Sequence, residues 1–390
     1  MKKCTIIGIS DSRDQWFKPE IEKIIANGKI FSGGLRHREI MKDTLPLNSK
    51  WIEITVPLQN AFEEYKKHED VIVFASGDPL FYGIGTTIKN NFSESEIIIY
   101  PCFNSLQMLA HKLGIAYQEM RVVSLTGRSW EKFDEALIRG EKLIGCLTDH
   151  NKTPNVIYER MLDYGYDNYK MIVGERLGNI AHERVSEFSK SMNYDTPNCL
   201  FLIKYSNKPK RFGIADNEFE LLNGRQKMIT KMPIRLNTPS ALELGSKENF
   251  WDIGFCTGSI SIEAKLMFPE LKITAFEVRK ECDELITKNS RKFGAPGIDH
   301  IICDFNDFDI NTLSEPDAVF IGGHGGRLNE IINKTCGRLK KNGCIVFNSV
   351  SEDSKHTFEE VTTCNGMSCK IIHTITVDEN NPITIMKAQW

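Results

Sequence analysis

The stretch WDIGFCTGSISIEA, residues 251–264, decides the fold of the carboxy-terminal half. It places Asp252 at the end of an apolar run typical of a buried strand, and a turn of small residues and a helical pattern follow. Small residues in such a turn let backbone amides and the positive end of a helix approach a polar ligand closely. Glu277 ends the next predicted strand about 20 positions further on, where a carboxylate can bind ribose hydroxyls. This combination predicts a nucleoside-binding site.

A glycine turn of this kind can also be purely structural, because such motifs are common without a ligand. The strand before it, the helix after it and the acid at the expected distance favour binding. We therefore take Gly254, Thr257 and Gly258 as candidate cofactor contacts, together with Asp252. Cys256 stands where such a loop usually has a glycine, so the backbone there must accommodate a β-carbon.

The rest of this half alternates further predicted strands (KITAFE, HIIC, DAVFIG and CIVFN) with helical patterns. Its last two apolar runs are joined only by DENNP, which is too short for a parallel crossover and predicts an antiparallel hairpin. That hairpin, and Asp252 before the first glycine, resemble the Rossmann-like class I methyltransferase fold, which implies S-adenosylmethionine as cofactor. In that fold the position of Asp304 often contacts the adenine amino group; the alternative is a solvated loop aspartate.

The amino-terminal half also reads as α/β, because short β-rich runs alternate with amphipathic helices from residue 4 to residue 205. We expect parallel strands, and a helix carrying Ile21, Ile24 and Ile25 that Gly28 closes in the left-handed conformation. Candidate strands are residues 5–9, 71–75, 97–100, 122–125, 143–147 and 200–203.

A polar break, SNKPKR at residues 206–211, separates the two halves. A chain of 390 residues is too long for one typical hydrophobic core. We therefore expect one domain over residues 1–205, a linker over 206–211 and a second domain over 212–390.

The run VIVFASGDPLFYGIG, residues 71–85, sets Gly77, Asp78 and Pro79 directly after a predicted buried strand. Alone it could be a plain β-turn. With SLTGR (124–128), GERLG (174–178) and PNCLFLI (197–203) it resembles the tetrapyrrole methylase superfamily, whose two-lobed α/β fold binds S-adenosylmethionine in a cleft. The resemblance is greatest to the members that methylate carbon 5 of a precorrin. The family's opening loop is only partly kept, since GISDS has Gly8 but lacks the usual nearby glycine and proline.

In the second half, DAVFIGGHGGRLNEII and the preceding GIADNEF and ITKMPIR resemble the decarboxylating precorrin methyltransferase family of cobalamin biosynthesis. The resemblance implies that Thr230 and Lys231 line the cofactor site and that Gly322 and Gly323 border the substrate. His324 lies in the same glycine-rich loop and could orient a carboxylate or move a proton, although a lone loop histidine can equally be solvated.

Precorrins carry many acidic side chains, and arginine binds carboxylates in a bidentate manner. We therefore take Arg128 and Arg176 as candidate substrate contacts, with fold-stabilising ion pairs as the alternative, and Arg235 as a further candidate substrate contact. Lys231 is a further candidate cation, and a solvated surface lysine is its alternative.

Together the two resemblances imply methylation of a precorrin at carbons 5 and 15, with loss of carbon dioxide from the acetate at carbon 12. Methyl transfer from a sulfonium to an electron-rich carbon depends mainly on alignment and exclusion of water, so no catalytic triad or metal site is expected. Two other functions stay open: an RNA methyltransferase, and a noncatalytic scaffold that binds S-adenosylmethionine.

Composition limits the partners. A formal net charge of −3 argues against a nucleic-acid-binding protein. The 11 cysteines are dispersed without a C-x-x-C pair, which argues against structural zinc and a disulfide framework. No apolar run is long enough for a membrane span or a signal peptide. We expect a cytoplasmic homo-oligomer that acts on a small-molecule tetrapyrrole.

Overall fold

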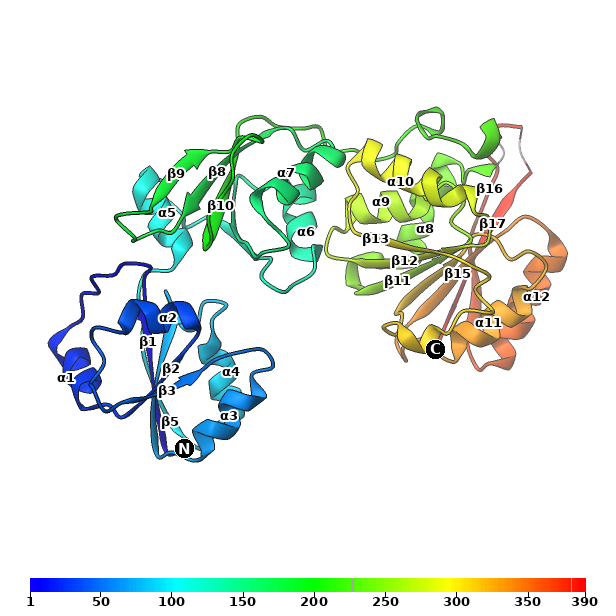
Figure 1. Ribbon diagram of the computed structural model, residues 1–390. Helices are drawn as coiled ribbons and strands as arrows, with labels where there is room; N and C mark the ends of the chain where they lie inside the picture. The colour runs from blue at the N-terminus through cyan, green and yellow to red at the C-terminus, as the bar shows by residue number, and fades with distance from the viewer. Residues whose placement is uncertain (226–227, 380) are drawn as a thin grey trace. The chain divides into compact units, whose positions relative to one another are not determined.

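The computed structural model describes residues 1–225, 228–379 and 381–390, which form two compact units (Figure 1). The first unit contains residues 1–128, 141–158 and 169–205. The second contains residues 129–140, 159–168 and the described residues from 206 to 390. None of the described helices has the length and apolar character needed to cross a membrane.

The first unit begins with a five-stranded sheet in which every pairing is parallel, as the sequence predicted. Its strands, in the order β3-β2-β4-β1-β5, are β1 (Lys3–Ile9), β2 (Ile30–Gly33), β3 (Lys50–Glu53), β4 (Asp70–Ser76) and β5 (Glu96–Tyr100). The helices of this region are α1 (Pro19–Asn27), α2 (Leu35–Met41), α3 (Gln59–Lys66) and α4 (Ile84–Asn91).

Both faces of this sheet are buried, which explains why its strands read as apolar runs. In β4, Val71 and Val73 pack with α3 and α4, whereas Ile72 and Phe74 pack with α1 and α2. Because the strands are parallel, the carboxyl ends of β1, β2 and β4 meet at one edge. Ligands bind outside such an edge where the strand order reverses.

A second sheet in the first unit departs from the expected parallel arrangement. Its strands, in the order β6-β7-β10-β8-β9, are β6 (Arg121–Ser124), β7 (Leu143–Leu147), β8 (Tyr169–Glu175), β9 (Arg184–Glu187) and β10 (Asn198–Lys204). Only β6 and β7 pair in parallel; the other pairings are antiparallel. The segments between β8, β9 and β10 contain no helix that could form a parallel crossover, so these strands return directly.

Three helices accompany this region of the chain, α5 (Ser105–Leu113), α6 (Glu131–Arg139) and α7 (Pro154–Asp163). Leu106 and Leu109 of α5 pack against Cys199 and Phe201 of β10.

Gly28 corrects one local expectation. It follows α1 with φ −70° and ψ 145°, so it is extended and not left-handed. Glycine is needed there for space, because a Cβ would lie 2.5 Å from Phe31 Cζ and 2.6 Å from Ile72 Cδ1. Gly294, at the end of a predicted helix of the second half, does adopt the left-handed conformation, with φ 70°.

The second unit holds a seven-stranded sheet whose final hairpin is antiparallel, as predicted. In the order β13-β12-β11-β14-β15-β17-β16, its strands are β11 (Asn249–Ile253), β12 (Lys272–Glu277), β13 (Ile298–Ile302), β14 (Ala318–Ile321), β15 (Cys344–Ser349), β16 (Ser368–Ile375) and β17 (Ile383–Gln389). This order confirms the class I methyltransferase fold.

Helices cover both faces of this sheet: α8 (Met232–Ala241), α9 (Ser259–Met267), α10 (Glu281–Phe293), α11 (Leu328–Cys336) and α12 (Glu352–Cys364). Short 3-10 helices are η1 (Asp216–Glu218), η2 (Leu222–Gly224), η4 (Leu244–Ser246) and η5 (Ile310–Thr312). Neighbouring residues of one strand point to opposite cores, since Trp251 packs with α11 and α12 and Phe250 packs with α8 and α9.

Candidate functional sites

A pocket of about 380 Å³ opens at the carboxyl ends of β11, β12, β13 and β14 in the second unit. Its wall includes five residues that the sequence singled out: Gly254, Glu277, Asp304, Gly323 and His324. These residues come from four separate loops, and parallel strands bring those loops to one edge of the sheet. The predicted nucleoside turn and the glycine-rich loop therefore form one site.

The turn after β11 depends on glycine. Gly254 has φ +81°, and a Cβ there would lie 2.6 Å from the backbone nitrogen of Gly323. Gly258 has φ +74°, and a Cβ there would lie 2.5 Å from Ile286 Cγ1. Cys256 also has a positive φ, +49°, a conformation that L side chains rarely adopt. The loop thus has a glycine-like backbone even at the position where its sequence departs from the usual motif.

Asp252 is buried beneath this turn. Its Oδ2 accepts a hydrogen bond of 2.6 Å from Ser261, whereas its Oδ1 has no hydrogen-bond partner among the described residues. Burial, with a smaller effect from the negative charge of Glu277, raises the pKa of Asp252 to about 7. The side chain is therefore largely protonated below neutral pH.

Glu277 is held in the ionised form by its surroundings. Its Oε2 accepts the backbone N–H of Cys256 at 3.0 Å, and the guanidinium of Arg279 binds both carboxylate oxygens at 2.7 and 2.9 Å. Burial alone would raise the pKa of Glu277, but the hydrogen bonds and charge of Arg279 outweigh burial and lower it. A ribose that bound this carboxylate would take the place of the Arg279 side chain.

Asp304 also lines the pocket and is partly exposed. Its Oδ2 accepts from Arg327 at 2.8 Å, and its Oδ1 accepts the N–H of Asn306 at 2.9 Å. The following loop is held by Lys334 of α11, whose ammonium donates to the carbonyls of Phe305, Asn306 and Phe308 at 2.8, 2.7 and 2.6 Å. The sequence did not reveal Lys334, because a lysine on an amphipathic helix reads as a solvated one.

His324 is a further residue of the pocket wall. Its Nδ1 accepts the N–H of Gly326 at 3.2 Å, so the proton of the neutral ring sits on Nε2. Burial lowers the pKa of His324, which favours this neutral form. The ring centroid lies 6.0 Å from that of Phe347.

Arg235 is not placed as a substrate contact, which corrects the sequence-based expectation. Its side chain is 0% exposed and pairs with Glu263 at 3.2 Å and Asp216 at 3.0 Å. It also donates to the backbone carbonyls of Thr230 and Ile214. Arg235 thus fixes the segment that precedes α8, and the sequence could not show this because the partners lie far along the chain.

Four other predicted residues are not part of this pocket wall. The wall, as far as the described residues form it, does not include Thr230, Lys231, Thr257 or Gly322. Lys231 approaches Asp216 at 3.6 Å. Thr257 is buried, and its carbonyl accepts from Asn289 at 2.9 Å.

The first unit has its own pocket of about 490 Å³, lined by residues from both of its sheets. Gly77 borders it with φ +59°, and a Cβ there would lie 2.7 Å from Asn104 Cα. Asp78 Oδ1 accepts the N–H of Leu80 at 2.9 Å and so stabilises the turn. A Cβ on Gly83 would lie 2.6 Å from the carbonyl oxygen of Pro79, so the turn is tightly packed.

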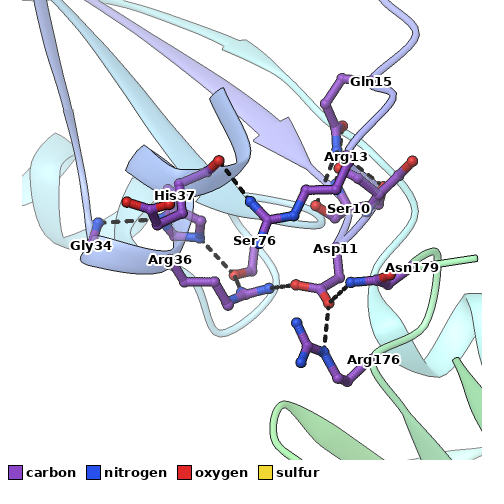
Figure 2. A network of polar contacts seen from close by, with 12 residues as sticks. Ser10, Asp11, Arg13, Gln15, Gly34, Arg36, His37, Ser76, Arg176 and Asn179 are labelled. Carbon is purple, nitrogen blue, oxygen red and sulfur yellow. Dashed lines mark hydrogen bonds and ion pairs between the residues drawn. The ribbon is translucent and has the colours of Figure 1, made fainter. Parts of the chain in front are cut away.

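The two predicted arginines of the first unit are both partnered. Arg176 has φ +47°, and its Nε donates to Asp11 at 3.2 Å (Figure 2). The guanidinium of Arg128 lies 5.0 Å from the ring centroid of Tyr82 and donates to Ser124 Oγ at 3.3 Å. Neither arginine contributes to the pocket wall as the described residues define it.

Sequence reasoning missed four polar residues that line this pocket, Asp11, Arg36, His37 and Ser76. They come from three different strand ends, and β2 was not predicted. The glycine pair of GGLRH, residues 33–37, could have marked the turn that brings Arg36 and His37 to the edge.

The fold and the pocket define the second unit as a class I methyltransferase domain, and comparison with known families agrees. Residues 223–389 match the family model described as "Precorrin methyltransferase domain", and residues 1–188 match "Tetrapyrrole (Corrin/Porphyrin) Methylases".

Curated relatives cover both halves. The chain is 29% identical over 357 residues, 90% of this chain and 85% of the relative, to the precorrin-6Y C(5,15)-methyltransferase [decarboxylating] of Sinorhizobium sp. It is 33% identical to the cobalt-precorrin-6B C(15)-methyltransferase (decarboxylating) of Salmonella typhimurium, over 35% of this chain and 69% of the relative. It is 30% identical to the cobalt-precorrin-7 C(5)-methyltransferase of that organism, over 46% of this chain and 88% of the relative. The chain therefore belongs to the tetrapyrrole methylase family through its first half and to the precorrin methyltransferase family through its second.

Proposed function

We propose that this chain methylates one precorrin macrocycle twice with S-adenosylmethionine, as a step of cobalamin biosynthesis. The first domain, residues 1–205, methylates carbon 5. The second, residues 212–390, methylates carbon 15 and removes carbon dioxide from the acetate at carbon 12, and residues 206–211 link the two. The observation that carries this proposal is the presence of both family domains in one chain, which also aligns over 90% of its length with the Sinorhizobium relative.

The second pocket fits a nucleoside. Glu277 offers an ionised carboxylate to ribose hydroxyls, and Asp304 offers an acceptor to an adenine amino group. Gly254 and Gly323 approach each other closely, and because neither has a side chain, their backbone groups can contact the nucleoside directly. Asp252, Thr257 and Gly258 shape the turn from below. S-adenosylmethionine, when bound, would supply a methyl group on a positively charged sulfur.

The residues around this pocket act by binding and orientation. Because the nucleophile is an electron-rich ring carbon, the protein needs to align it with the methyl group and to exclude water. His324, neutral with its proton on Nε2, can donate a hydrogen bond to a substrate carboxylate. Gly322 and Gly323, which have no side chains, leave room for the substrate beside His324. Thr230 and Lys231, directly before α8, add cofactor contacts from that segment.

In the first domain the turn formed by Gly77, Asp78 and Pro79 lies at the carboxyl end of β4, where sheets of this kind hold ligands. We assign this turn to the cofactor. Arg128 and Arg176 supply positive charge near a substrate that carries several carboxylates.

Mass analysis of the intact chain with precorrin-6B and S-adenosylmethionine tests the proposal. We expect the macrocycle to gain two methyl groups and to lose one carbon dioxide. Gly77→Val should stop the reaction after one methyl and the loss of carbon dioxide, because its side chain would collide with Asn104.

Two results would reject this function. Binding of S-adenosylhomocysteine without any turnover would indicate a scaffold. Salt-sensitive binding of transfer RNA, with no change in the macrocycle, would indicate an RNA methyltransferase.

A further inference from the structure

We propose that Arg36 and Ser76 form a subsite in the first unit that binds a carboxylate side chain of the macrocycle, and that Asp11 is the positioning residue that holds Arg36 there. This inference rests on the proposed methylation of a precorrin. Asp11 and Ser76 lie within the stretches GISDS and VIVFASGDPLFYGIG, but neither of them, nor Arg36, was among the site residues expected from the sequence.

The three residues come from neighbouring strand ends. Asp11 follows β1, Arg36 lies in the first turn of α2 just after β2, and Ser76 is the last residue of β4. The strands lie in the order β2-β4-β1, so their carboxyl ends are adjacent. All three side chains line the 490 Å³ pocket and point toward one another in Figure 2.

Asp11 pairs with two arginines, Arg36 and Arg176, and its single negative charge neutralises only one of them. Its Oδ1 accepts from Arg36 Nη1 at 2.6 Å, and its Oδ2 accepts from Arg176 and Asn179, each at 3.2 Å. Burial tends to raise the pKa of Asp11, but its bonds to Arg36 and Asn179 outweigh burial and lower it. One carboxylate therefore faces two guanidinium groups, and the cluster has an excess of one positive charge.

Two neighbouring side chains, Arg36 and His37, meet the oxygen of Ser76, so its hydroxyl proton must point away from both of them. Its Oγ accepts from Arg36 Nη2 at 2.6 Å and lies 2.9 Å from His37 Nε2. His37 Nδ1 accepts the N–H of Gly34 at 3.2 Å, which places the ring proton on Nε2 and makes that nitrogen a donor to Ser76. Burial, aided by the charge of Arg36, lowers the pKa of His37 to about 4, so the ring is neutral.

Both lone pairs of the Ser76 oxygen are thus occupied, and its O–H must donate to another group. The Ser76 side chain is exposed to the pocket. Arg36 is 35% exposed and uses two of its five N–H groups for Asp11 and Ser76. The subsite therefore presents donors and a net positive charge, which is what a carboxylate requires.

A side-chain carboxylate of the substrate fits this subsite better than the carboxylate of the cofactor. The amino-acid end of S-adenosylmethionine also carries an ammonium group, which two nearby guanidinium groups would repel. An acetate or propionate of the macrocycle brings negative charge alone. We therefore assign the subsite to the macrocycle.

Steady-state kinetics of carbon 5 methylation by the full chain test this assignment, with the macrocycle already methylated at carbon 15 as substrate. Arg36→Met should raise KM for the macrocycle about tenfold or more, because it removes a charge-assisted hydrogen bond. KM for S-adenosylmethionine should stay within twofold.

Three other variants refine the test. Arg36→Lys should recover part of the loss, and Ser76→Ala should raise KM for the macrocycle severalfold. Asp11→Asn should also raise KM for the macrocycle, but less than Arg36→Met does, because Arg36 remains and only its position is less fixed.

Arg38→Met is the matched control, because Arg38 is an exposed residue of the same helix and does not line the pocket. Methylation at carbon 15, in the second unit of the same chain, reports on the quality of each preparation. If Arg36→Met fails to fold, Ser76→Ala and Arg36→Lys still carry the test.

The assignment is overturned if these variants leave KM for the macrocycle unchanged, or if KM for S-adenosylmethionine rises as much. Failure of the proposed function is a different result, since the unaltered chain would then not methylate carbon 5.

Discussion

In the first unit a single buried carboxylate, Asp11, faces two guanidinium groups, whereas in the second unit Glu277 and Asp304 each face one, from Arg279 and Arg327. The first arrangement leaves positive charge at the pocket and suits an anion. In the second, one guanidinium pairs with each carboxylate, so no positive charge is left over, and Glu277 can accept hydrogen bonds from a ribose once the Arg279 side chain is displaced. Both pockets are proposed to bind ligands for methyl transfer, yet one holds them with basic side chains and the other with acidic ones. This is possible because aligning the methyl group with the ring carbon does not require any particular side chain.

Breaking the buried ion pair between Arg235 and Glu263 in the second unit tests whether Arg235 stabilises the fold or binds substrate. It gives the largest expected effect. Arg235→Met should lower the free energy of unfolding of this unit by about 3–5 kcal/mol, because it leaves Glu263 buried without its partner. Chemical denaturation measures the change. Combining it with Glu263→Gln should cost less than the sum of the single changes. Unchanged stability with a raised KM would restore Arg235 as a substrate contact.

Substituting Glu277 tests whether the pocket of the second unit binds the nucleoside part of the cofactor. Glu277→Gln should weaken binding of S-adenosylhomocysteine to the second unit about 100-fold, because charged acceptors for two hydroxyls are lost. Methylation at carbon 15 should fall while methylation at carbon 5 continues. Glu284→Gln, an exposed acid of α10 paired with Lys288, is the control. Equal loss of both methylations would argue against two separate cofactor sites.

Asp252 tests how a buried acid behaves beside an ionised one. Its pKa is raised in the folded state to about 7, so the native chain binds an extra proton between about pH 4 and pH 7. Stability from the protonated form is therefore present at low pH and is lost as the pH rises through 7.

Asp252→Asn cannot ionise, so its stability relative to the unaltered chain should increase by about 2 kcal/mol from pH 5 to pH 8. Denaturation at both pH values measures this difference. The same difference at both would show that Asp252 is ionised throughout.

Lys334 tests the loop that carries Asp304 and gives the smallest expected effect. Lys334→Met removes three hydrogen bonds to backbone carbonyls and should weaken S-adenosylhomocysteine binding to the second unit about tenfold, since the loop loses its support. Calorimetry measures the affinity, and Lys341→Met, an exposed turn residue, is the control. Undiminished affinity would mean that the loop is held by other contacts.

Local signals in the sequence predicted the features that depend on local backbone geometry. The turn after β11 and the final hairpin were predicted because glycine spacing and a short connection constrain the chain directly. The antiparallel strands β8 and β9 were not predicted. β9 has only four residues, none of them buried, whereas the MIV run of β8 could have been recognised as a strand. The ion pairs of Arg235 and Asp11 join residues far apart in sequence, so only the folded topology reveals them.

The contact between Gly254 and Gly323 makes the two positions unequal in what they tolerate. A methyl group on Gly254 would strike the neighbouring loop at 2.6 Å, whereas one on Gly323 would meet Gly254 Cα only at 3.8 Å. Divergence among descendants of this protein should therefore accumulate at position 323 while position 254 stays fixed. Because Gly323 borders the pocket, that drift would reshape the cavity and alter ligand preference without unfolding the domain.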